Sequence, residues 1–444
     1  MTTPATTLTG QLIDRVRAVQ YETLPATAID IAKACALDGI AVMLAGATEP
    51  LGLGRIVTQF VKDAGGNPQA TVIAGGFKTS MVNAAYANGT MAHALDFDNT
   101  WYPLNHPTSP TLPAILAIAE NHNLGGKKII ESLVAAFEVQ GRMRMAATGL
   151  ETGSGFHKPG TTGQFGAVTA AAKMLGLDRQ QMLMAFGIAG SRAGSMSINT
   201  GTMTKSSHSG HAARMGLECA VLAKMGFTGS ADVFGPKGFF DTFLFGKAEP
   251  HLLVDNFGAP FRMVDPGVGF KKHPSNYFTH RPIDAALALR NEHGIKPDQI
   301  ANVEVVFPRF EYVNRPQPET GLDGKFSVQY TTAVALLGFM QVPGEMVPQL
   351  MFGAIDKFSL LAVPFFLFVG EIMGVGGMSR RIVDWVLVLL GNTRVDLVDD
   401  LEVDGEAACG AALSDGSVIE LDRQYGMNET TVLHEGVHAA TERT

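Results

Sequence analysis

The segment 93–107, HALDFDNTWYPLNHP, places two carboxylates, a hydroxyl and an imidazole in one predicted loop that connects two helices. A histidine beside carboxylates that fix its tautomer can act as a general acid or base near neutral pH. His106 is therefore a candidate for proton transfer, with Asp96 nearby in the sequence. The alternative is ordinary capping, in which Asp98 and Thr100 cap a helix and His106 lies in solvent.

A glycine-rich segment at residues 155–163, GFHKPGTTG, precedes a predicted helix that begins at Gln164. Backbone N–H groups at a helix N-terminus attract anions, and His157 and Lys158 would add positive charge. This segment is a candidate site for a carboxylate. The alternative is a plain turn with a threonine cap.

Two further segments contain lysine and histidine side chains. Residues 201–211, GTMTKSSHSGH, precede a predicted helix and include Lys205 and His208. Residues 270–276, FKKHPSN, include Lys271 and lie at a predicted domain boundary, where clefts commonly form. Charge-assisted hydrogen bonds from such side chains could hold one carboxylate. The alternative for both segments is a set of solvated surface lysines and histidines.

Motifs that would imply a metal or a nucleotide are incomplete. His434 and His438 form an H-E-x-x-H sequence, but no later residue supplies a third zinc ligand at a suitable spacing. No phosphate-binding glycine loop lies between a strand and a helix. The three cysteines, Cys35, Cys219 and Cys409, are too scattered for an iron–sulfur cluster.

The composition is that of a compact acidic protein, with 46% hydrophobic residues and a formal net charge of −8. No run of lysine and arginine interleaves with aromatic residues, so we expect no nucleic-acid partner. Residues 1–20 lack the basic and apolar regions of a secretory signal, and the unpaired cysteines fit a reducing compartment. We therefore expect a cytoplasmic protein.

The first part of the chain has mainly helical periodicity, and its helices must position the candidate segments described above. Apolar residues recur at helical spacing over residues 26–45, 80–94, 127–146 and 164–175. The sequence predicts a mostly α fold with a large all-α domain over residues 1–265.

The pattern changes after Pro266. Residues 301–307, 394–403 and 416–421 alternate β-branched and polar side chains and predict strands, whereas residues 280–292 and 326–337 predict helices. These elements indicate a smaller α+β domain at residues 266–404, followed by a C-terminal segment at 405–444.

An apolar stretch begins at residue 358 and extends, with a glycine-rich interruption, to residue 390. A membrane-spanning helix needs about 20 apolar residues, and the uninterrupted run at 358–370 is shorter and contains Pro364. We expect a buried segment and no membrane association. A membrane span within residues 358–390 is the alternative.

Six ordered motifs resemble the MmgE/PrpD family over residues 8–337. They are HALDFDNTW with HP at 93–107, EVQGR at 138–142, HKPGTTGQFG at 157–166, GTMTKSSHSGHAA at 201–213, GFTGSADV at 226–233 and FSVQY at 326–330. Residues 96–101, 138–142 and 312–316 are most similar to the cis-aconitate decarboxylase branch. By contrast, residues 357–391 resemble the large membrane subunit of tripartite ATP-independent periplasmic transporters.

The family resemblance implies an α-helical domain with a smaller α+β lid, a C-terminal segment that returns toward the helical domain, and a homodimer. It implies a lyase for a small di- or tricarboxylic acid, such as a cis-aconitate decarboxylase or a 2-methylcitrate dehydratase, that uses neither metal nor organic cofactor. The alternatives are an isomerase or epimerase of a dicarboxylate, and a catalytically degenerate carboxylate-binding paralogue.

The same resemblance, carried over motif by motif, implies eight site residues. Fixed cations would stabilise the negative charge that develops when water or CO₂ is lost, while an imidazole moves the proton. The expected catalytic residues are His106, Lys205, Tyr330 and Asp96, and the expected substrate-binding residues are Thr100, His157, His208 and Lys271.

Overall fold

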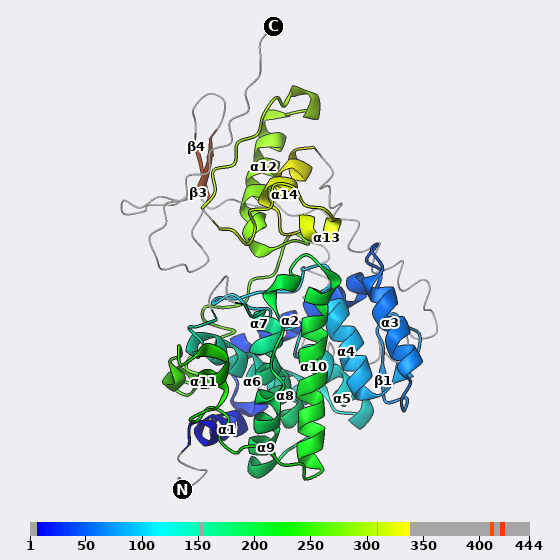
Figure 1. Ribbon diagram of the computed structural model, residues 1–444, viewed down its shortest axis with the longest axis vertical. Coiled ribbons are helices and arrows are strands. Elements are labelled where there is room, and N and C mark those ends of the chain that lie inside the picture. Colours follow the sequence, from blue (N-terminus) through cyan, green and yellow to red (C-terminus); the bar gives the residue numbers. More distant parts are fainter. Residues whose placement is uncertain (1–6, 151–154, 309, 338–408, 413–417, 422–444) are drawn as a thin grey trace. The chain divides into compact units, whose positions relative to one another are not determined.

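The structure is a computed structural model that describes residues 7–150, 155–308, 310–337, 409–412 and 418–421 (Figure 1). These residues divide into two compact units, with residues up to Lys271 in the first and the later ones in the second. The domain limits at 265 and 404 stay predictions. The apolar stretch at 358–390 and the H-E-x-x-H sequence lie outside the described residues. Within the described part of the chain, no helix is long and apolar enough to cross a membrane.

The first unit consists mainly of helices. Its two short strands, β1 (Ala70–Thr71) and β2 (Lys78–Thr79), pair antiparallel. Its α-helices are α1 (Leu8–Ala18), α2 (Ala26–Ala47), α3 (Leu53–Ala64), α4 (Met81–Ala92), α5 (Leu112–His122), α6 (Gly126–Ala146), α7 (Lys158–Thr161), α8 (Gly163–Met174), α9 (Arg179–Gly190), α10 (Met203–Lys224) and α11 (Phe239–Leu244). This content confirms the predicted mostly α fold class, and the helices predicted over residues 26–45, 80–94, 127–146 and 164–175 correspond to α2, α4, α6 and α8. The helix predicted to follow residue 211 begins earlier, at Met203, so Lys205 and His208 lie within α10.

The second unit contains α12 (His280–His293), α13 (Gly321–Gly324) and α14 (Val328–Leu336). Ile283 and Ala286 of α12 form a small core with Ala335 and Leu336 of α14. Strands β3 (Cys409–Ala412) and β4 (Val418–Leu421) pair antiparallel, with Cys409 opposite Leu421. The predicted helices at 280–292 and 326–337 are confirmed, as is the strand that ends at Leu421.

The strand predicted at residues 301–307 is wrong, because in the described part of the chain this segment belongs to no sheet. A strand requires a hydrogen-bonded neighbour as well as an alternating pattern. The segment with a similar predicted pattern, residues 394–403, lies outside the described residues.

Helix α8 is buried along its whole length, and most of its side chains are small. Helices α6 and α10 both pack against it. At Gly166 of α8, an added Cβ would lie 2.7 Å from the side-chain nitrogen of Gln140 in α6. At Gly216 of α10, an added Cβ would lie 2.5 Å from the Cβ of Ala167. Glycine therefore permits close helix contacts on two sides of α8.

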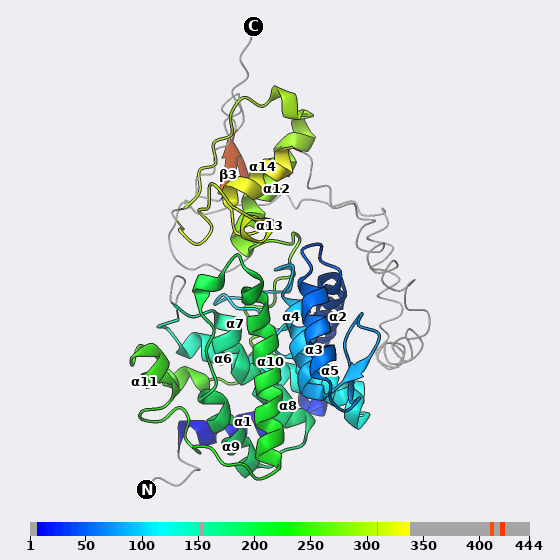
Figure 2. The same cartoon turned by 45° about the vertical axis from the view of Figure 1, so that its right-hand side comes forward.

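Helices α4 and α10 run side by side in both overall views (Figures 1 and 2). They cross at two glycines, because a Cβ added to Gly89 would lie 2.8 Å from the Cα of Gly210. A Cβ added to Gly210 would lie 2.1 Å from the hydroxyl oxygen of Thr90. Because both residues are glycines, the two helices can approach closely. This close approach places His93, at the C-terminal end of α4, beside the first turns of α10.

Candidate active site

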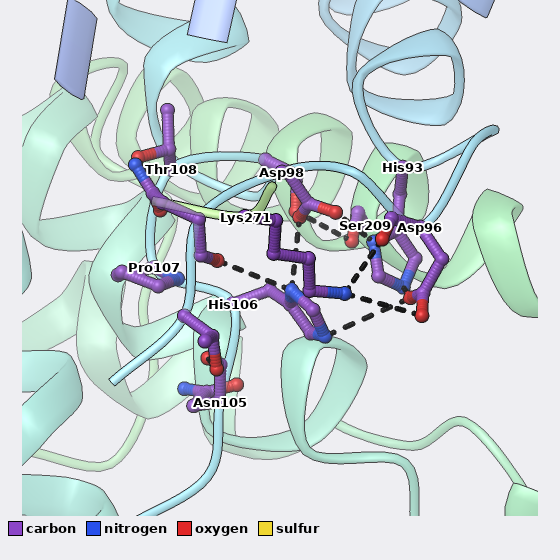
Figure 3. A network of polar contacts seen from close by, with 12 residues as sticks. His93, Asp96, Asp98, Asn105, His106, Pro107, Thr108, Ser209 and Lys271 are labelled. Carbon is purple, nitrogen blue, oxygen red and sulfur yellow. Dashed lines mark hydrogen bonds and ion pairs between the residues drawn. The ribbon is translucent and has the colours of Figure 1, made fainter. Parts of the chain in front are cut away.

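Asp96 lies in the first unit, in the loop that follows α4, and contacts two lysine side chains. Figure 3 shows its contact with one of them, Lys271. The Nζ of Lys205, from the first turn of α10, is 2.6 Å from Oδ1 of Asp96. The Nζ of Lys271 is 3.2 Å from Oδ2 of Asp96 and donates a hydrogen bond of 2.6 Å to its carbonyl oxygen. All three side chains are buried. The site thus holds one carboxylate against two ammonium groups away from solvent.

The two ammonium groups keep Asp96 ionised. Burial by itself raises the pKa of Asp96, but the positive charges of Lys205 and Lys271 outweigh that effect and hold the pKa well below its usual value. Burial lowers the pKa of Lys271, and the negative charges of Asp96 and Asp98 oppose this change. The charged forms of these groups therefore depend on one another.

Backbone contacts position these groups. Thr100 and Gly269 exchange two backbone hydrogen bonds, of 2.9 and 2.7 Å, which attach the segment of Lys271 to the loop of Asp96. The hydroxyl of Ser206 donates to the carbonyl oxygen of His93 at 3.0 Å and so joins α10 to the end of α4. Asp96 itself has a left-handed backbone with φ of 50°, a region that aspartate tolerates better than most residues.

His93 contacts both a carboxylate and an ammonium group. Its Nδ1 is 2.8 Å from Oδ1 of Asp98, and its Nε2 is 2.8 Å from Nζ of Lys205. Burial is the main cause that lowers the pKa of His93 to about 3. The negative charge of Asp98 opposes this change, and the positive charge of Lys205 adds to it. His93 is therefore a neutral imidazole at neutral pH.

His106 packs edge-on against His93, with ring centroids 4.6 Å apart. Its Nδ1 faces the carbonyl oxygen of Asn99 at 3.2 Å and Oδ2 of Asp98 at 3.3 Å. Its Nε2 faces Oδ1 of Asp96 at 3.8 Å. Because both neighbours of Nδ1 are acceptors, a proton on Nδ1 is favoured, and Nε2 is the nitrogen that can exchange a proton.

His157 and His208 form a second imidazole pair, with a distance of 3.0 Å between their Nδ1 atoms. The His157 ring also lies 5.6 Å from that of His93. Burial, followed by the charge of Lys205, lowers the pKa of His157 well below its usual value and that of His208 to about 4. Lys205 thus influences several imidazoles, which are neutral at neutral pH.

Sequence comparison matches the chain to two domains of one family. The MmgE/PrpD N-terminal domain matches residues 10–252, more than half of the 444 residues, and the MmgE/PrpD C-terminal domain matches residues 273–341. The chain belongs to the MmgE/PrpD family. This result confirms the resemblance inferred from the six motifs.

Several named relatives are similar to this MmgE/PrpD chain. Human (Homo sapiens) cis-aconitate decarboxylase is 34% identical over 271 residues, which cover 59% of this chain and 56% of that protein. The mouse (Mus musculus) protein of the same name is 32% identical over 301 residues, covering 65% and 61%. The 2-methylcitrate dehydratase of Salmonella typhimurium is 27% identical over 361 residues, covering 74% and 71%. The chain spans less than two thirds of the length of the two mammalian relatives.

A third match is to the DctM component of the tripartite ATP-independent periplasmic transporter, over residues 320–397. It includes the stretch 357–391, for which a resemblance to this transporter class was predicted. Most of the match lies outside the described residues.

The structure brings most of the predicted site residues of this MmgE/PrpD protein into one cluster. Within 4 Å of the carboxylate of Asp96 lie the side-chain nitrogens of His106, Lys205 and Lys271. The ring of His157 lies beside that of His93, and His208 contacts His157. The hydroxyl of Thr100 donates to the carbonyl oxygen of Asn105 at 2.9 Å. Tyr330 belongs to α14 of the second unit, where it is 46% exposed. The chemical role of each residue stays a prediction.

Sequence reasoning did not assign His93 or Asp98 to the site. Both lie within the segment 93–107 that was singled out, but His93 stands at the end of a helical pattern and Asp98 was interpreted as a possible cap. The sequence spacing could have indicated them, since His93 and Asp98 each lie within three residues of Asp96. Only their contacts separate them from ordinary capping residues, since both adjoin His106 and His93 also contacts Lys205.

Four of these residues, His93, Asp96, Asp98 and His106, offer nitrogen and oxygen atoms that all lie within 4.8 Å of one another. Such a group could in principle hold a metal ion. However, the ammonium of Lys205 contacts both Asp96 and His93, and that of Lys271 contacts Asp96. Two positive charges at these ligand atoms oppose a bound cation. The contacts of the two lysines therefore disfavour a metal ion at these atoms.

Proposed function

We propose that this protein is a lyase that acts on a small di- or tricarboxylic acid, in the manner of a cis-aconitate decarboxylase or a 2-methylcitrate dehydratase. The observation that carries this proposal is the position of Asp96, a carboxylate bound by Lys205 and Lys271 with Nε2 of His106 at 3.8 Å. Carboxylate binding and proton transfer are the two requirements of such a reaction, and both groups lie in one buried cluster.

In a decarboxylation, the bond between a carboxylate carbon and its neighbour breaks and CO₂ leaves. The electron pair stays on the remaining carbon skeleton, where an adjacent carboxylate or double bond delocalises it. Lys205 and Lys271 would stabilise this negative charge, because cations fixed in a water-poor site need no reorganisation during the reaction. A proton from Nε2 of His106 would then form the new C–H bond, and solvent would restore that proton.

A dehydration would use the same groups in a different order. A base removes a proton from the carbon next to a carboxylate, the C–O bond breaks, and the leaving hydroxide takes up a proton and departs as water. The two lysines would again stabilise the intermediate charge. The relatives named for each reaction support a shared apparatus, in which the position of the substrate decides which bond breaks.

The arrangement of the cluster also supports acid–base chemistry that does not depend on a cofactor. Asp98 contacts Nδ1 of both His93 and His106, which orients His106 toward Asp96.

The homodimeric state and the cytoplasmic location expected from the sequence belong to the same proposal. An isomerase would use similar groups, but its product would have the same mass as its substrate.

An NMR time course of the purified protein with cis-aconitate and with 2-methylcitrate tests the proposal. We expect loss of CO₂ or water from one of them, and we expect His106→Ala and Lys205→Ala to abolish it. The exposed residues His122 and Lys127 provide matched controls, as His122→Ala and Lys127→Ala should retain activity. A folded protein that binds these acids without converting either would support the degenerate carboxylate-binding paralogue instead.

A further inference from the structure

We infer that Gln140 of α6 is a positioning residue for His106, because its side-chain amide holds the residues on both sides of that histidine. The structural part of this inference stands on the contacts alone, and its catalytic consequence rests on the proposed function. Among the residues that the structure describes, Gln140 hydrogen-bonds to Asn105 and Pro107 and not to His106, Lys205 or Lys271, so it would act through the loop.

The amide of Gln140 uses both of its ends. Its Oε1 accepts a hydrogen bond of 2.7 Å from Nδ2 of Asn105, and its Nε2 donates one of 3.1 Å to the carbonyl oxygen of Pro107. A carbonyl oxygen can only accept, so the nitrogen of Gln140 must face Pro107 and its oxygen must face Asn105. The two partners flank His106 directly in the loop (Figure 3).

The surroundings leave Gln140 little freedom. Its side chain is fully buried. Gly166 of α8 lies so close that an added Cβ would be 2.7 Å from Nε2 of Gln140. On the other side of the loop, the hydroxyl of Thr100 donates to the carbonyl oxygen of Asn105 at 2.9 Å. The loop around His106 is therefore held at Asn105 by Gln140 and Thr100, with a longer contact of 3.4 Å to the hydroxyl of Thr162. At Pro107 it is held by Gln140 and by the hydroxyl of Thr111, which donates to the same carbonyl oxygen at 2.6 Å.

The position of His106 depends on short distances that a moving loop would lose. Its Nδ1 lies 3.2 Å from the carbonyl oxygen of Asn99, and its Nε2 lies 3.8 Å from Asp96. Displacement of a catalytic group by about 1 Å can lower a rate by roughly 100-fold. If Gln140 sets this position, its loss should lower kcat and leave KM nearly unchanged, since the lysines that would bind carboxylates stay in place.

Three variants test the inference. Gln140→Met removes both hydrogen bonds with little change in size, and Asn105→Ala removes one of them from the opposite partner. Gln164→Met is the matched control, because Gln164 is also a fully buried glutamine but donates to the carbonyl oxygen of Ala189. We expect kcat to fall roughly 10- to 100-fold in the first two variants and to stay unchanged in the control.

A second readout does not require activity. In ¹⁵N spectra of histidine-labelled protein, the ring resonances of His106 are assigned by their absence in His106→Ala. We expect Gln140→Met and Asn105→Ala to shift these resonances, and Gln164→Met to leave them unchanged. If Gln140→Met fails to fold, Asn105→Ala decides the question.

Unchanged His106 resonances in both loop variants would overturn the inference, whatever their thermal stability or activity. A wild-type protein that converts no acid would contradict the proposed function, but the ring resonances of His106 would still show whether Gln140 positions this residue. The two failures are therefore distinguishable.

Discussion

The Nζ of Lys205 lies 2.8 Å from Nε2 of His93, and both side chains are buried. An ammonium group has only donors, so Nε2 of His93 must accept this hydrogen bond. The remaining proton of the imidazole then lies on Nδ1, which donates to Asp98 at 2.8 Å. Lys205 thus sets the tautomer of His93 and adds to the effect of burial, which keeps the imidazole neutral. Acidic conditions that protonate His93 would place two cations in contact.

Stability should therefore fall as the pH is lowered below 6.5, the usual pKa of histidine. The folded pKa is about 3 for His93, about 4 for His208 and well below the usual value for His157. Below pH 6.5 the unfolded chain takes up protons that the folded protein does not. Each histidine then contributes up to about 1.4 kcal/mol per pH unit to the fall in the free energy of unfolding.

Asp38 acts in the opposite direction. Burial and the nearby charge of Asp98 raise its pKa to about 7, so the folded protein keeps a proton that the unfolded chain loses above its ordinary pKa. His211, whose pKa burial also lowers, acts in the same direction as the other three histidines. With these histidines opposed by Asp38, we expect a net loss of about 3 kcal/mol between pH 6 and pH 5. Urea denaturation at these two pH values measures it. His208→Gln should reduce the slope, His122→Gln should not, and an equal stability at both pH values would contradict the prediction.

Replacement of Lys205 by methionine should reduce activity strongly. The variant keeps most of the side-chain volume but removes the charge beside Asp96 and the donor to His93. We expect kcat/KM to fall by roughly 10²- to 10³-fold, as for the loss of one preorganised charge-stabilising group. The pKa of His93 should rise, because Lys205 lowers it in the native protein. Steady-state kinetics and histidine NMR measure the two effects, with Lys127→Met as the control, and an unchanged pKa of His93 would argue against the contact.

Replacement of Asp96 by asparagine should destabilise the protein. The variant leaves Lys205 and Lys271 buried without the carboxylate that both contact. Removal of one partner from a buried ion pair costs about 3–5 kcal/mol. Asp14→Asn is the control, since Asp14 pairs with Arg179 at the surface, where a salt bridge contributes at most about 1 kcal/mol. Equal urea midpoints for the two variants would show that Asp96 is not a buried counter-charge.

Replacement of Gly210 by alanine should separate α4 from α10. The new Cβ would lie 2.1 Å from the Thr90 hydroxyl oxygen and 2.3 Å from the carbonyl oxygen of Tyr86, so the helices must move apart. We expect a loss of about 1–3 kcal/mol in the free energy of unfolding, together with reduced activity because His93 and Lys205 no longer meet. In Gly194→Ala, where no atom lies within 4 Å, stability should stay close to that of the wild type. A Gly210→Ala protein as stable as this control would mean that the crossing is looser than the structure shows.

Local patterns were sufficient for several of the helices. The predicted stretches at 127–146 and 164–175 correspond closely to α6 and α8, because apolar side chains at helical spacing and the glycines that precede each run are properties of neighbouring residues. The strand at 301–307 could not be decided in this way, since a strand depends on a partner elsewhere in the chain. Gln140 was visible in the motif EVQGR, but its two partners were not, because they lie 35 and 33 residues away.

By itself, the sequence determined the mostly α fold class, the family, and the segments that contain the chemically active side chains. Only the tertiary structure decided which of them meet. Lys205 and Lys271 lie 109 and 175 residues from Asp96 in the chain, yet both contact it. It also decided that His93 is neutral, because the protonation of an imidazole depends on burial and on charges within a few ångströms. Those distances are set by the packing of whole helices, such as the glycine crossing of α4 and α10, which no local pattern of residues contains.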